Sequence, residues 1–427
     1  MIDIKLIREN PELVKENIRR KSQDYKLVLI DEIIEYDKEL KKIRSESDTL
    51  RHRRNILSEE INRLKKSGKD ASSVLKEVKE IPEKIKKIEE TVIHLESKIQ
   101  KNMLQIPNIM YSGVPSGKDS SENVEIKTGG HIRKFDFPIK THIELAENLC
   151  IANWESSAKV TGTGFYYLKN DLALLNQALI RFAIDFMYNK KYEYIEPPLM
   201  LNDNAIFASM DKAAIEQSVY SIKDEDLNLI GTSEQAVLAM HTNETIPESE
   251  LPKKYFSYSM CFRKEIGAHG INEKGLWRTH QFNKVEQFIF CRPEDSEKYY
   301  DELLENSEGI LQALELPYRV LEICTGDLAD WKYRSADLEV WRPTINEYGE
   351  VMSLSNCTEY QARKLNIKCV DKNGNKRVLH TLNDTALATS RIMVTILENN
   401  QNEDGTINIP KALQQYMHGK KKIEKLN

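Results

Sequence analysis

The sequence predicts an α+β fold in which a long antiparallel helical hairpin precedes an antiparallel sheet flanked by helices. Apolar residues recur at alternating spacings of three and four over residues 36–64 and again over 74–99, which is typical of paired helices. Beyond residue 130, helical stripes and strand-like runs do not alternate strictly, which favours an antiparallel sheet over a doubly wound parallel one. The 427 residues allow two or three domains.

The composition excludes several classes of protein. Charged residues make up 30% of the chain and its net charge is −5, so a uniformly basic nucleic-acid coat is excluded, although a local basic patch is not. No apolar run approaches the ~18 residues that span a bilayer, and the N-terminus has no signal-peptide core. We therefore expect a cytoplasmic protein without a membrane partner. Six cysteines without a C-x-x-C pair favour reduced core residues over a zinc site: Cys150, Cys261, Cys291, Cys324, Cys357 and Cys369.

The first 26 residues are predicted to form a short helical cap, and Pro11 marks a helix start because proline is tolerated at the first helical position. The two apolar seams follow, with a turn cluster at residues 67–70. The outgoing helix, residues 33–66, would be roughly 50 Å long. Pro82 either kinks the returning helix or marks where its regular part begins. The seam positions are Tyr36, Leu40, Ile43, Ser47, Leu50, Arg54, Leu57, Ile61 and Leu64, then Val74, Val78, Ile81, Ile85, Ile88, Val92, Leu95 and Ile99.

The hairpin is basic relative to the rest of the chain. Residues 1–110 contain 25 Lys and Arg against 21 Asp and Glu, whereas the remainder contains 37 against 46. A solvated coiled-coil surface is one interpretation. The other is a rod that lies along a nucleic-acid backbone, where basic side chains gain affinity by releasing counterions. The central basic residues are Arg44, Arg51, Arg53 and Arg54.

Residues 107–130 have the proline, glycine and polar content of a linker, so we expect a domain boundary near residue 110 and domains of 1–110 and 111–427. In the second domain, residues 140–190, 296–314 and 384–398 are predicted to be helical, with a strong apolar stripe between Leu172 and Met187. Strands are predicted at 192–195, 255–262, 282–290 and 351–354. A polar loop punctuated by Gly267, Gly270 and Gly275 joins the second and third strands.

The second domain lacks the common glycine-rich phosphate loops and the H-E-x-x-H metal motif. It carries fixed charges on or beside its strands instead. Arginine suits bidentate phosphate or carboxylate recognition, and carboxylates beside a triphosphate suit Mg²⁺. Each charge alone is more often a surface or ion-pair residue, and together they suggest nucleotide chemistry: Arg263, Glu265, Glu286, Glu350 and Arg391.

The runs CFRKEIGAHG at 261–270 and LWRTHQFNKVE at 276–286 are followed by LNDTALATSR at 382–391. The first two resemble motif 2, and the third motif 3, of the seryl-tRNA synthetase family of class II aminoacyl-tRNA synthetases. IEPP at 195–198 resembles motif 1, TSE at 232–234 the serine motif, and EVMSLSN at 350–356 a further strand. The N-terminal hairpin resembles the family's tRNA-binding arm, so the resemblance covers nearly the whole chain.

The resemblance implies a class II antiparallel sheet preceded by a coiled-coil arm, in a homodimer that forms through motif 1. We expect its interface at the apolar stripe from Leu172 to Met187 and at Pro197 and Pro198. It also implies the reaction: L-serine and ATP give seryl-adenylate and pyrophosphate, and the seryl group passes to the 3′ end of tRNA(Ser), or of tRNA(Sec) where that tRNA exists. Arg44, Arg51, Arg53 and Arg54 then become candidates for tRNA binding.

By resemblance, the ATP contacts are Arg263, Lys264, Glu265, Thr279, Phe282, Glu350, Val351, Met352, Ser353 and Arg391. Those implied for serine are Thr232, Ser233, Glu234, Arg263, Glu286, Asn383 and Thr385. Catalysis would rest on Arg263, Glu286 and Arg391, because adenylation moves negative charge onto the α-phosphate and the pyrophosphate. Glu350 and Ser353 match the Mg²⁺ position, since a carboxylate and a hydroxyl suit a hard ion that bridges phosphates.

Alanine and glycine are rejected if the pocket hydrogen-bonds the serine hydroxyl, because its own polar groups would otherwise stay unpaired. Motif 3 departs from the commonest bacterial pattern, N-G-S-G-L-A-x-G-R, while Thr385 keeps a hydroxyl. Two other functions are considered. A relative that loads a carrier protein would lack the long arm, and a non-catalytic RNA-binding homologue would have lost Arg263, Glu286 or Arg391.

Overall fold

The computed structural model describes residues 1–265 and 275–426. The predicted loop positions Gly267 and Gly270 therefore lie outside the described residues. Contacts divide the chain into two compact units, Ile2–Pro107 and Asn108–Asn427, and Met1 is counted with the second. No helix in the described part of the chain is long and apolar enough to cross a membrane. All six cysteines are free, and five of them are buried.

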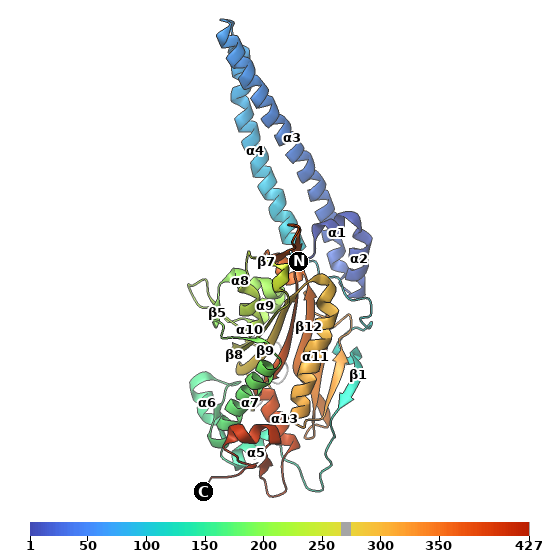
Figure 1. Ribbon diagram of the computed structural model, residues 1–427, viewed down its shortest axis with the longest axis vertical. Coiled ribbons are helices and arrows are strands. Elements are labelled where there is room, and N and C mark those ends of the chain that lie inside the picture. Colours follow the sequence, from blue (N-terminus) through green and yellow to red (C-terminus); the bar gives the residue numbers. More distant parts are fainter. Residues whose placement is uncertain (266–274, 427) are drawn as a thin grey trace. The chain divides into compact units, whose positions relative to one another are not determined.

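The first unit is a helical cap followed by a long helical hairpin (Figure 1). Asn10 caps the second helix by accepting from the Leu13 amide, and Pro11 is its first residue, as predicted. Leu57, Ile81 and Ile85 form a buried cluster between the two long helices. Pro82 lies inside the returning helix, so that helix does not begin there. The helices are α1 Ile4–Glu9, α2 Pro11–Arg20, α3 Leu27–Lys66 and α4 Ser72–Met103, with a 3₁₀ turn at Asp24–Lys26.

The second unit is built on an eight-stranded sheet in the order β1-β10-β11-β12-β15-β9-β8-β4. Seven of these strands pair antiparallel, and only the edge strand β4 runs parallel to its neighbour. The predicted α+β class and antiparallel sheet are confirmed. The strands are β1 Val124–Gly129, β4 Glu193–Ile195, β8 Lys253–Phe262, β9 Gln281–Cys291, β10 Tyr318–Glu322, β11 Arg334–Arg342, β12 Glu347–Thr358 and β15 His380–Ala388.

Three helices, α7 Asn170–Asn189, α11 Ser296–Ala313 and α13 Thr389–Asn399, pack against the central strands (Figure 1). Their apolar faces meet alternate residues of the strands in one large core. On β9, Val285 and Ile289 enter that core, and Gln287 bonds to α11. Because side chains alternate across a strand, the even-numbered residues of β9 face the opposite side of the sheet.

Shorter elements surround this core. The helices are α5 His142–Asn148, α6 Trp154–Thr161, α8 Asp203–Ser209, α9 Lys212–Ser218, α10 Ser233–Ala239 and α12 Tyr360–Lys364. The strands are β2 Ala152–Asn153, β3 Tyr167–Leu168, β5 Met200–Leu201, β6 Asn228–Leu229, β7 Thr245–Pro247, β13 Lys368–Val370, β14 Lys376–Val378, β16 Ile407–Asn408 and β17 Lys422–Ile423.

Four sequence predictions for this unit need correction. Residues 384–388 continue β15 rather than start a helix, because this segment pairs with β9. The predicted helical region 140–190 contains three helices and two short strands. The expected linker ends in β1 and is tied down by Asn108, whose side chain donates to the Trp331 and Cys357 carbonyls. The stripe from Leu172 to Met187 packs inside the core of its own unit, so it is not exposed as a dimer interface.

Candidate active site

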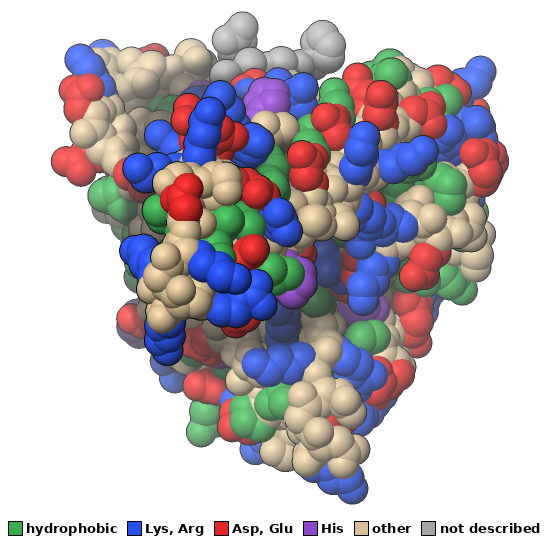
Figure 2. Space-filling model, turned by 90° about the horizontal axis from the view of Figure 1, so that it is seen from above, with side chains coloured by type: hydrophobic (Ala, Val, Ile, Leu, Met, Phe, Trp, Pro, Cys, Tyr) green, Lys and Arg blue, Asp and Glu red, His purple; other side chains and the backbone are tan. Residues whose placement is uncertain are grey.

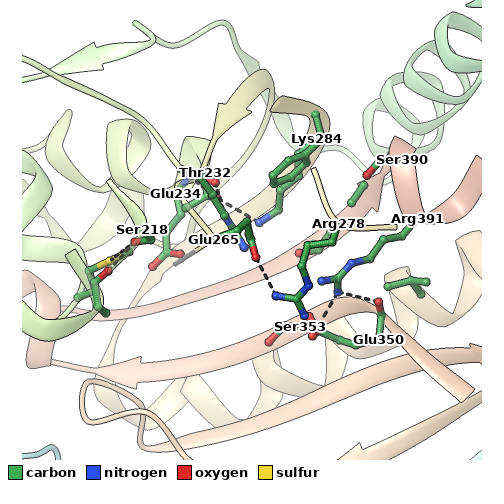
Figure 3. Close-up of a pocket in the computed structure, with 18 of the residues that line it drawn as sticks. Ser218, Thr232, Glu234, Glu265, Arg278, Lys284, Glu350, Ser353, Ser390 and Arg391 are labelled. Carbon is green, nitrogen blue, oxygen red and sulfur yellow. Dashed lines mark hydrogen bonds and ion pairs between the residues drawn. The ribbon is translucent and has the colours of Figure 1, made fainter. Parts of the chain in front are cut away.

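A cavity of about 560 Å³ opens on the side of the sheet away from α11, over strands β9, β12 and β15 (Figure 3). Most of the residues implied for serine and ATP line it, although they come from distant parts of the sequence. These are Thr232, Glu234, Arg263, Glu265, Thr279, Phe282, Glu350, Val351, Ser353, Asn383, Thr385 and Arg391.

Four of the predicted residues are not among those that line the cavity: Ser233, Lys264, Glu286 and Met352. Ser233 is fully buried and its hydroxyl accepts from the Ser257 hydroxyl at 2.7 Å. Met352 lies in the core on the helical side of β12. The Lys264 amide bonds to the Ser218 carbonyl. Glu286 is 1% exposed, and its carboxylate lies against two residues that line the cavity, Lys284 and Asn383.

Bulges in two strands determine which residues line the cavity. Glu350 and Ser353 are three apart, so a regular strand would place them on opposite faces. The pairing of β11 with β12 shifts register next to Val351, and this bulge brings both side chains to the cavity. A second shift on β15, after Thr385, keeps Ala388 on the cavity side as well. These bulges explain why the lining residues do not follow an alternating pattern in the sequence.

One end of the cavity is a buried polar cluster. The Asn383 amide donates both to Glu234 Oε2 at 3.1 Å and to Glu286 Oε1 at 3.0 Å, so it bridges two carboxylates. Gln361 donates to the other oxygen of Glu234 at 2.7 Å. Asn383 Oδ1 is buried without a hydrogen-bond partner in the described structure. A buried unpaired acceptor is costly, so this end suits a ligand that brings hydrogen-bond donors.

The electrostatics of this cluster favour a cationic ligand. Burial and the neighbouring Glu286 raise the pKa of Glu234 to about 7. Burial also raises the pKa of Asp384, on the opposite face of β15, well above its usual range, and its carboxyl group accepts from Ser307. An ammonium group entering beside Glu234 would favour its ionised form, because an opposite charge nearby lowers a carboxyl pKa.

Lys284 contacts Thr232 on one side of this cluster (Figure 3) and Glu286 on the other. Its ammonium lies 2.6 Å from Glu286 Oε2 and donates to the Thr232 hydroxyl at 3.1 Å. The Thr232 hydroxyl also caps α10 by accepting from the Glu234 amide. A single short strand-to-helix turn therefore positions both Thr232 and Glu234.

The other end of the cavity is rich in arginine. Arg391 is paired with Glu350, at 3.2 Å to the carboxylate and 2.7 Å to the main-chain carbonyl. Arg278 is paired with Glu265 at 2.9 Å (Figure 3). These guanidinium groups are partly exposed, with side chains 23% and 32% accessible. They are therefore available to phosphate or carboxylate groups, which guanidinium recognises by paired hydrogen bonds.

Arg263 lies between the two ends. Its Nε donates to the Gly231 carbonyl at 3.0 Å, and its guanidinium lies 5.3 Å from the centroid of the Phe282 ring. The Gly231 contact uses the Nε atom, and Gly231, Arg263 and Phe282 all line the cavity. A forked donor in this position can hold two anionic groups in contact.

Glu350 and Ser353 also fit a Mg²⁺ ion. Asp337 faces Ser353 across the paired strands and is hydrogen-bonded to it. The described residues hold no cluster of three His, Cys, Asp or Glu side chains suited to a metal. Mg²⁺ does not need such a cluster, since it commonly takes one or two carboxylates and completes its shell with water and substrate phosphates. The oxygen donors present match that chemistry.

Comparisons with known proteins identify the family. A model of the seryl-tRNA synthetase N-terminal domain matches residues 1–110, and one of the class II tRNA synthetase core domain (G, H, P, S and T) matches residues 218–400. The serine–tRNA ligase of Methanocella arvoryzae is 44% identical over 98% of this chain and 99% of its own. The chain belongs to the seryl-tRNA synthetase family.

Solved structures of this family agree. The seryl-tRNA synthetase of Pyrococcus horikoshii, complexed with ATP, is 40% identical and superposes with a TM-score of 0.96 over the whole of both chains. The cytoplasmic serine–tRNA ligase of Naegleria fowleri, in complex with AMP, is 33% identical, with a TM-score of 0.91 over 100% of this chain and 99% of its own. The class II synthetase fold predicted from the motifs is therefore confirmed.

In this member of the seryl-tRNA synthetase family, three of the four arm arginines predicted to bind tRNA are already ion-paired. Arg44 pairs with Glu96, Arg51 with Glu89 at 3.1 Å, and Arg53 with Glu77 at 2.9 Å, and all of these side chains are exposed. The fourth, Arg54, has no ion pair within the described residues. Figure 2 shows acidic and basic side chains intermixed on the face it displays, rather than a field of one sign.

The sequence motifs missed several residues of this synthetase's cavity. Lys284 lies inside the motif 2 run but was not singled out, and Trp277, Arg278 and Lys332 also line the cavity. The signal for Lys284 was present, because it lies two residues from both Phe282 and Glu286 on a predicted strand. Gln361 had no comparable signal, since it reaches Glu234 from a helix more than a hundred residues away.

Proposed function

We propose that the protein is a serine–tRNA ligase, which activates L-serine with ATP and transfers the seryl group to the 3′ end of tRNA(Ser). The observation that carries the proposal is a single cavity with a buried anionic end and an arginine-rich end, joined by Arg263. An amino acid presents an ammonium group and a carboxylate, and a nucleoside triphosphate presents phosphates. The two ends match these groups in sign.

The reaction needs no side-chain nucleophile, because the serine carboxylate itself attacks the α-phosphate and pyrophosphate leaves. Arg263 holds the carboxylate against the α-phosphate, so its contribution is proximity together with stabilisation of the charge that develops. Arg391 neutralises charge on the outer phosphates, and Phe282 offers a ring face for adenine stacking. Glu286 and Thr385 lie where the serine hydroxyl and ammonium groups need acceptors.

Glu350 and Ser353 would hold Mg²⁺, and the ion would supply positive charge beside the phosphates of ATP. Arg391 is the neighbouring cation on the protein side, paired with Glu350 at 3.2 Å. Val351, Thr279 and Glu265 line the cavity beside them, whereas Lys264, another predicted ATP contact, does not.

The remaining parts of the proposal concern the macromolecular partners. Residues 1–110 form the tRNA-binding arm domain and residues 111–427 the catalytic domain. The protein acts in the cytoplasm as a homodimer, and tRNA(Sec) is a second substrate where it exists. Exposed apolar side chains around motif 1, Tyr188, Leu199 and Met200, support the dimer, whereas the buried stripe from Leu172 to Met187 does not.

Pyrophosphate exchange into ATP, measured with each of the twenty amino acids, tests the activity. We expect exchange that depends on serine and on Mg²⁺, and charging of tRNA(Ser) with serine. Exchange supported by another amino acid, or by none, would overturn the proposal. Sedimentation at micromolar concentration tests the dimer, and a monomer there would contradict that part.

A further inference from the structure

Lys284 is a buried cation in the amino-acid end of the cavity, and neither ATP binding nor carboxylate binding accounts for it. Its side chain is only 8% exposed. It lines the cavity, whereas its ion-pair partner Glu286 is 1% exposed and does not. A ligand at this end meets the Lys284 ammonium, and Glu286 Oε2, 2.6 Å from that ammonium, is buried without a hydrogen-bond partner in the described structure.

This pairing offers a ligand a donor and an acceptor side by side. The ammonium of Lys284 only donates hydrogen bonds, and the carboxylate of Glu286 only accepts them. A hydroxyl group does both, so it satisfies both partners at once. A methyl group satisfies neither, and a second ammonium can donate to Glu286 but is repelled by Lys284.

The charges lead to the same discrimination. Glu234 and Glu286 supply two negative charges to this end when ionised, and Lys284 supplies one positive charge. One charge is left to be balanced, which is what a single α-ammonium provides. An amino acid with a second, side-chain ammonium would leave the buried end with an excess positive charge, and buried unbalanced charge is unfavourable.

We infer that the Lys284–Glu286 pair reads the side-chain hydroxyl of the substrate, with Lys284 as a specificity-determining residue that donates to the hydroxyl oxygen and excludes cationic side chains. This inference rests on the proposed function, because it concerns the amino acid that the same cavity activates. The proposed function gave a role to Glu286 alone, and the inference adds a role for Lys284.

L-2,3-diaminopropionate tests this directly, since it is serine with an amine in place of the hydroxyl. Pyrophosphate exchange is measured with serine, alanine and diaminopropionate at a pH low enough to keep the side-chain amine protonated. In Lys284→Met, we expect kcat/KM for serine to fall about tenfold or more, because a hydrogen bond to a charged group is lost. The ratio of kcat/KM for diaminopropionate to that for serine should rise by about a hundredfold, because a charge repulsion is removed as well.

Two further variants separate specificity from general damage. Lys254→Met removes a lysine that pairs with Glu302 at 2.8 Å outside the cavity, and it should leave the ratio unchanged. The double variant Lys284→Met/Glu286→Gln removes the carboxylate that would receive the second ammonium, so the gain should disappear. An unchanged ratio in Lys284→Met, or a gain that persists in the double variant, would overturn the inference.

A measurement on the unmodified protein covers the case in which Lys284→Met does not fold. If Lys284 excludes the cationic side chain, only the neutral amine is accepted. The kcat/KM for diaminopropionate should then rise with pH more steeply than that for serine, through the titration of the substrate's side-chain amine. Parallel pH profiles would contradict the inference while leaving serine activation, and so the proposed function, intact. Absence of serine-dependent exchange would instead count against the proposed function.

Discussion

The cavity and the arm both contain close ion pairs, but in opposite surroundings. Lys284 and Glu286 lie 2.6 Å apart with side chains 8% and 1% exposed, whereas Arg53 and Glu77 lie 2.9 Å apart with side chains 49% and 47% exposed. Breaking a buried pair leaves an uncompensated charge, while an exposed pair is screened by water and salt. Charged groups in the cavity are therefore held by buried partners and can recognise a ligand. Charged groups on the arm can exchange an exposed partner for water, salt or another ligand.

The largest effect is expected at Arg263. Replacement by alanine removes the forked donor between the two ends of the cavity, and with it a hydrogen bond to the Gly231 carbonyl and a contact with the Phe282 ring. Serine-dependent pyrophosphate exchange should fall by about 10²–10³, or ~3–4 kcal/mol in transition-state stabilisation, as for other preorganised donors. The thermal unfolding midpoint should change little.

Arg53→Ala is the matched control for that substitution. It also replaces an arginine by alanine, but this arginine lies on the arm and its ion-pair partner is exposed. It should exchange pyrophosphate at the unmodified rate. If Arg263→Ala kept near-normal exchange, or if both variants lost it equally, the contrast between fixed and exchangeable charge would fail.

Removal of the arm should separate the two steps of the reaction. The arm is a hairpin in its own compact unit, and every residue that lines the cavity belongs to the other unit. Deleting residues 36–99 and joining the ends by a short turn should leave pyrophosphate exchange largely intact. Charging of tRNA should fall severely, mainly through a higher KM for tRNA. Loss of exchange in a folded deletion variant would show that the cavity depends on the arm.

The pH dependence of serine binding should report on Glu234. Its pKa is raised to about 7 by burial and by Glu286, so the carboxyl group binds a proton as the pH falls through 7. A protonated carboxyl attracts an ammonium less, so the KM for serine should rise on acidification, by up to about tenfold per pH unit. The KM for ATP should not follow.

Glu234→Gln should have a higher KM for serine at high pH, and its KM should change less with pH below 7.

The raised pKa of Glu234 also predicts how the stability of the fold changes with pH. Because the folded protein holds this proton more tightly than the unfolded chain, Glu234 lowers stability progressively as the pH rises from its ordinary pKa of 4.5 towards 7. Glu234→Gln should reduce that part of the pH dependence of unfolding. A KM profile for serine that is unchanged by Glu234→Gln would contradict the assignment.

The same contrast explains how much of the molecule was predictable. The arm followed from local repeats, because seam residues such as Leu57, Ile81 and Ile85 recur at fixed spacing and pack on each other. The cavity was reached through motifs, and the motif runs contain most of its lining, although fewer than half of the lining residues had been singled out. What remained hidden depends on pairing between distant strands: the bulge at Val351, and the continuation of β15 through 384–388, where helical periodicity was misleading.

The smallest effect concerns the exposed arm pair, and it is expected to be a gain. Glu77→Gln removes the carboxylate of the pair, so Arg53 remains but no longer has an anionic partner in Glu77. The pair is solvent-exposed, so the unfolding midpoint should stay the same within error. If the arm lies along the phosphate backbone, the freed guanidinium should lower the KM for tRNA by about threefold at low salt and have no effect at high salt. Pyrophosphate exchange, which needs no tRNA, should not change. A raised KM for tRNA, or a gain that persists at high salt, would show that Arg53 serves the coiled coil rather than the nucleic acid.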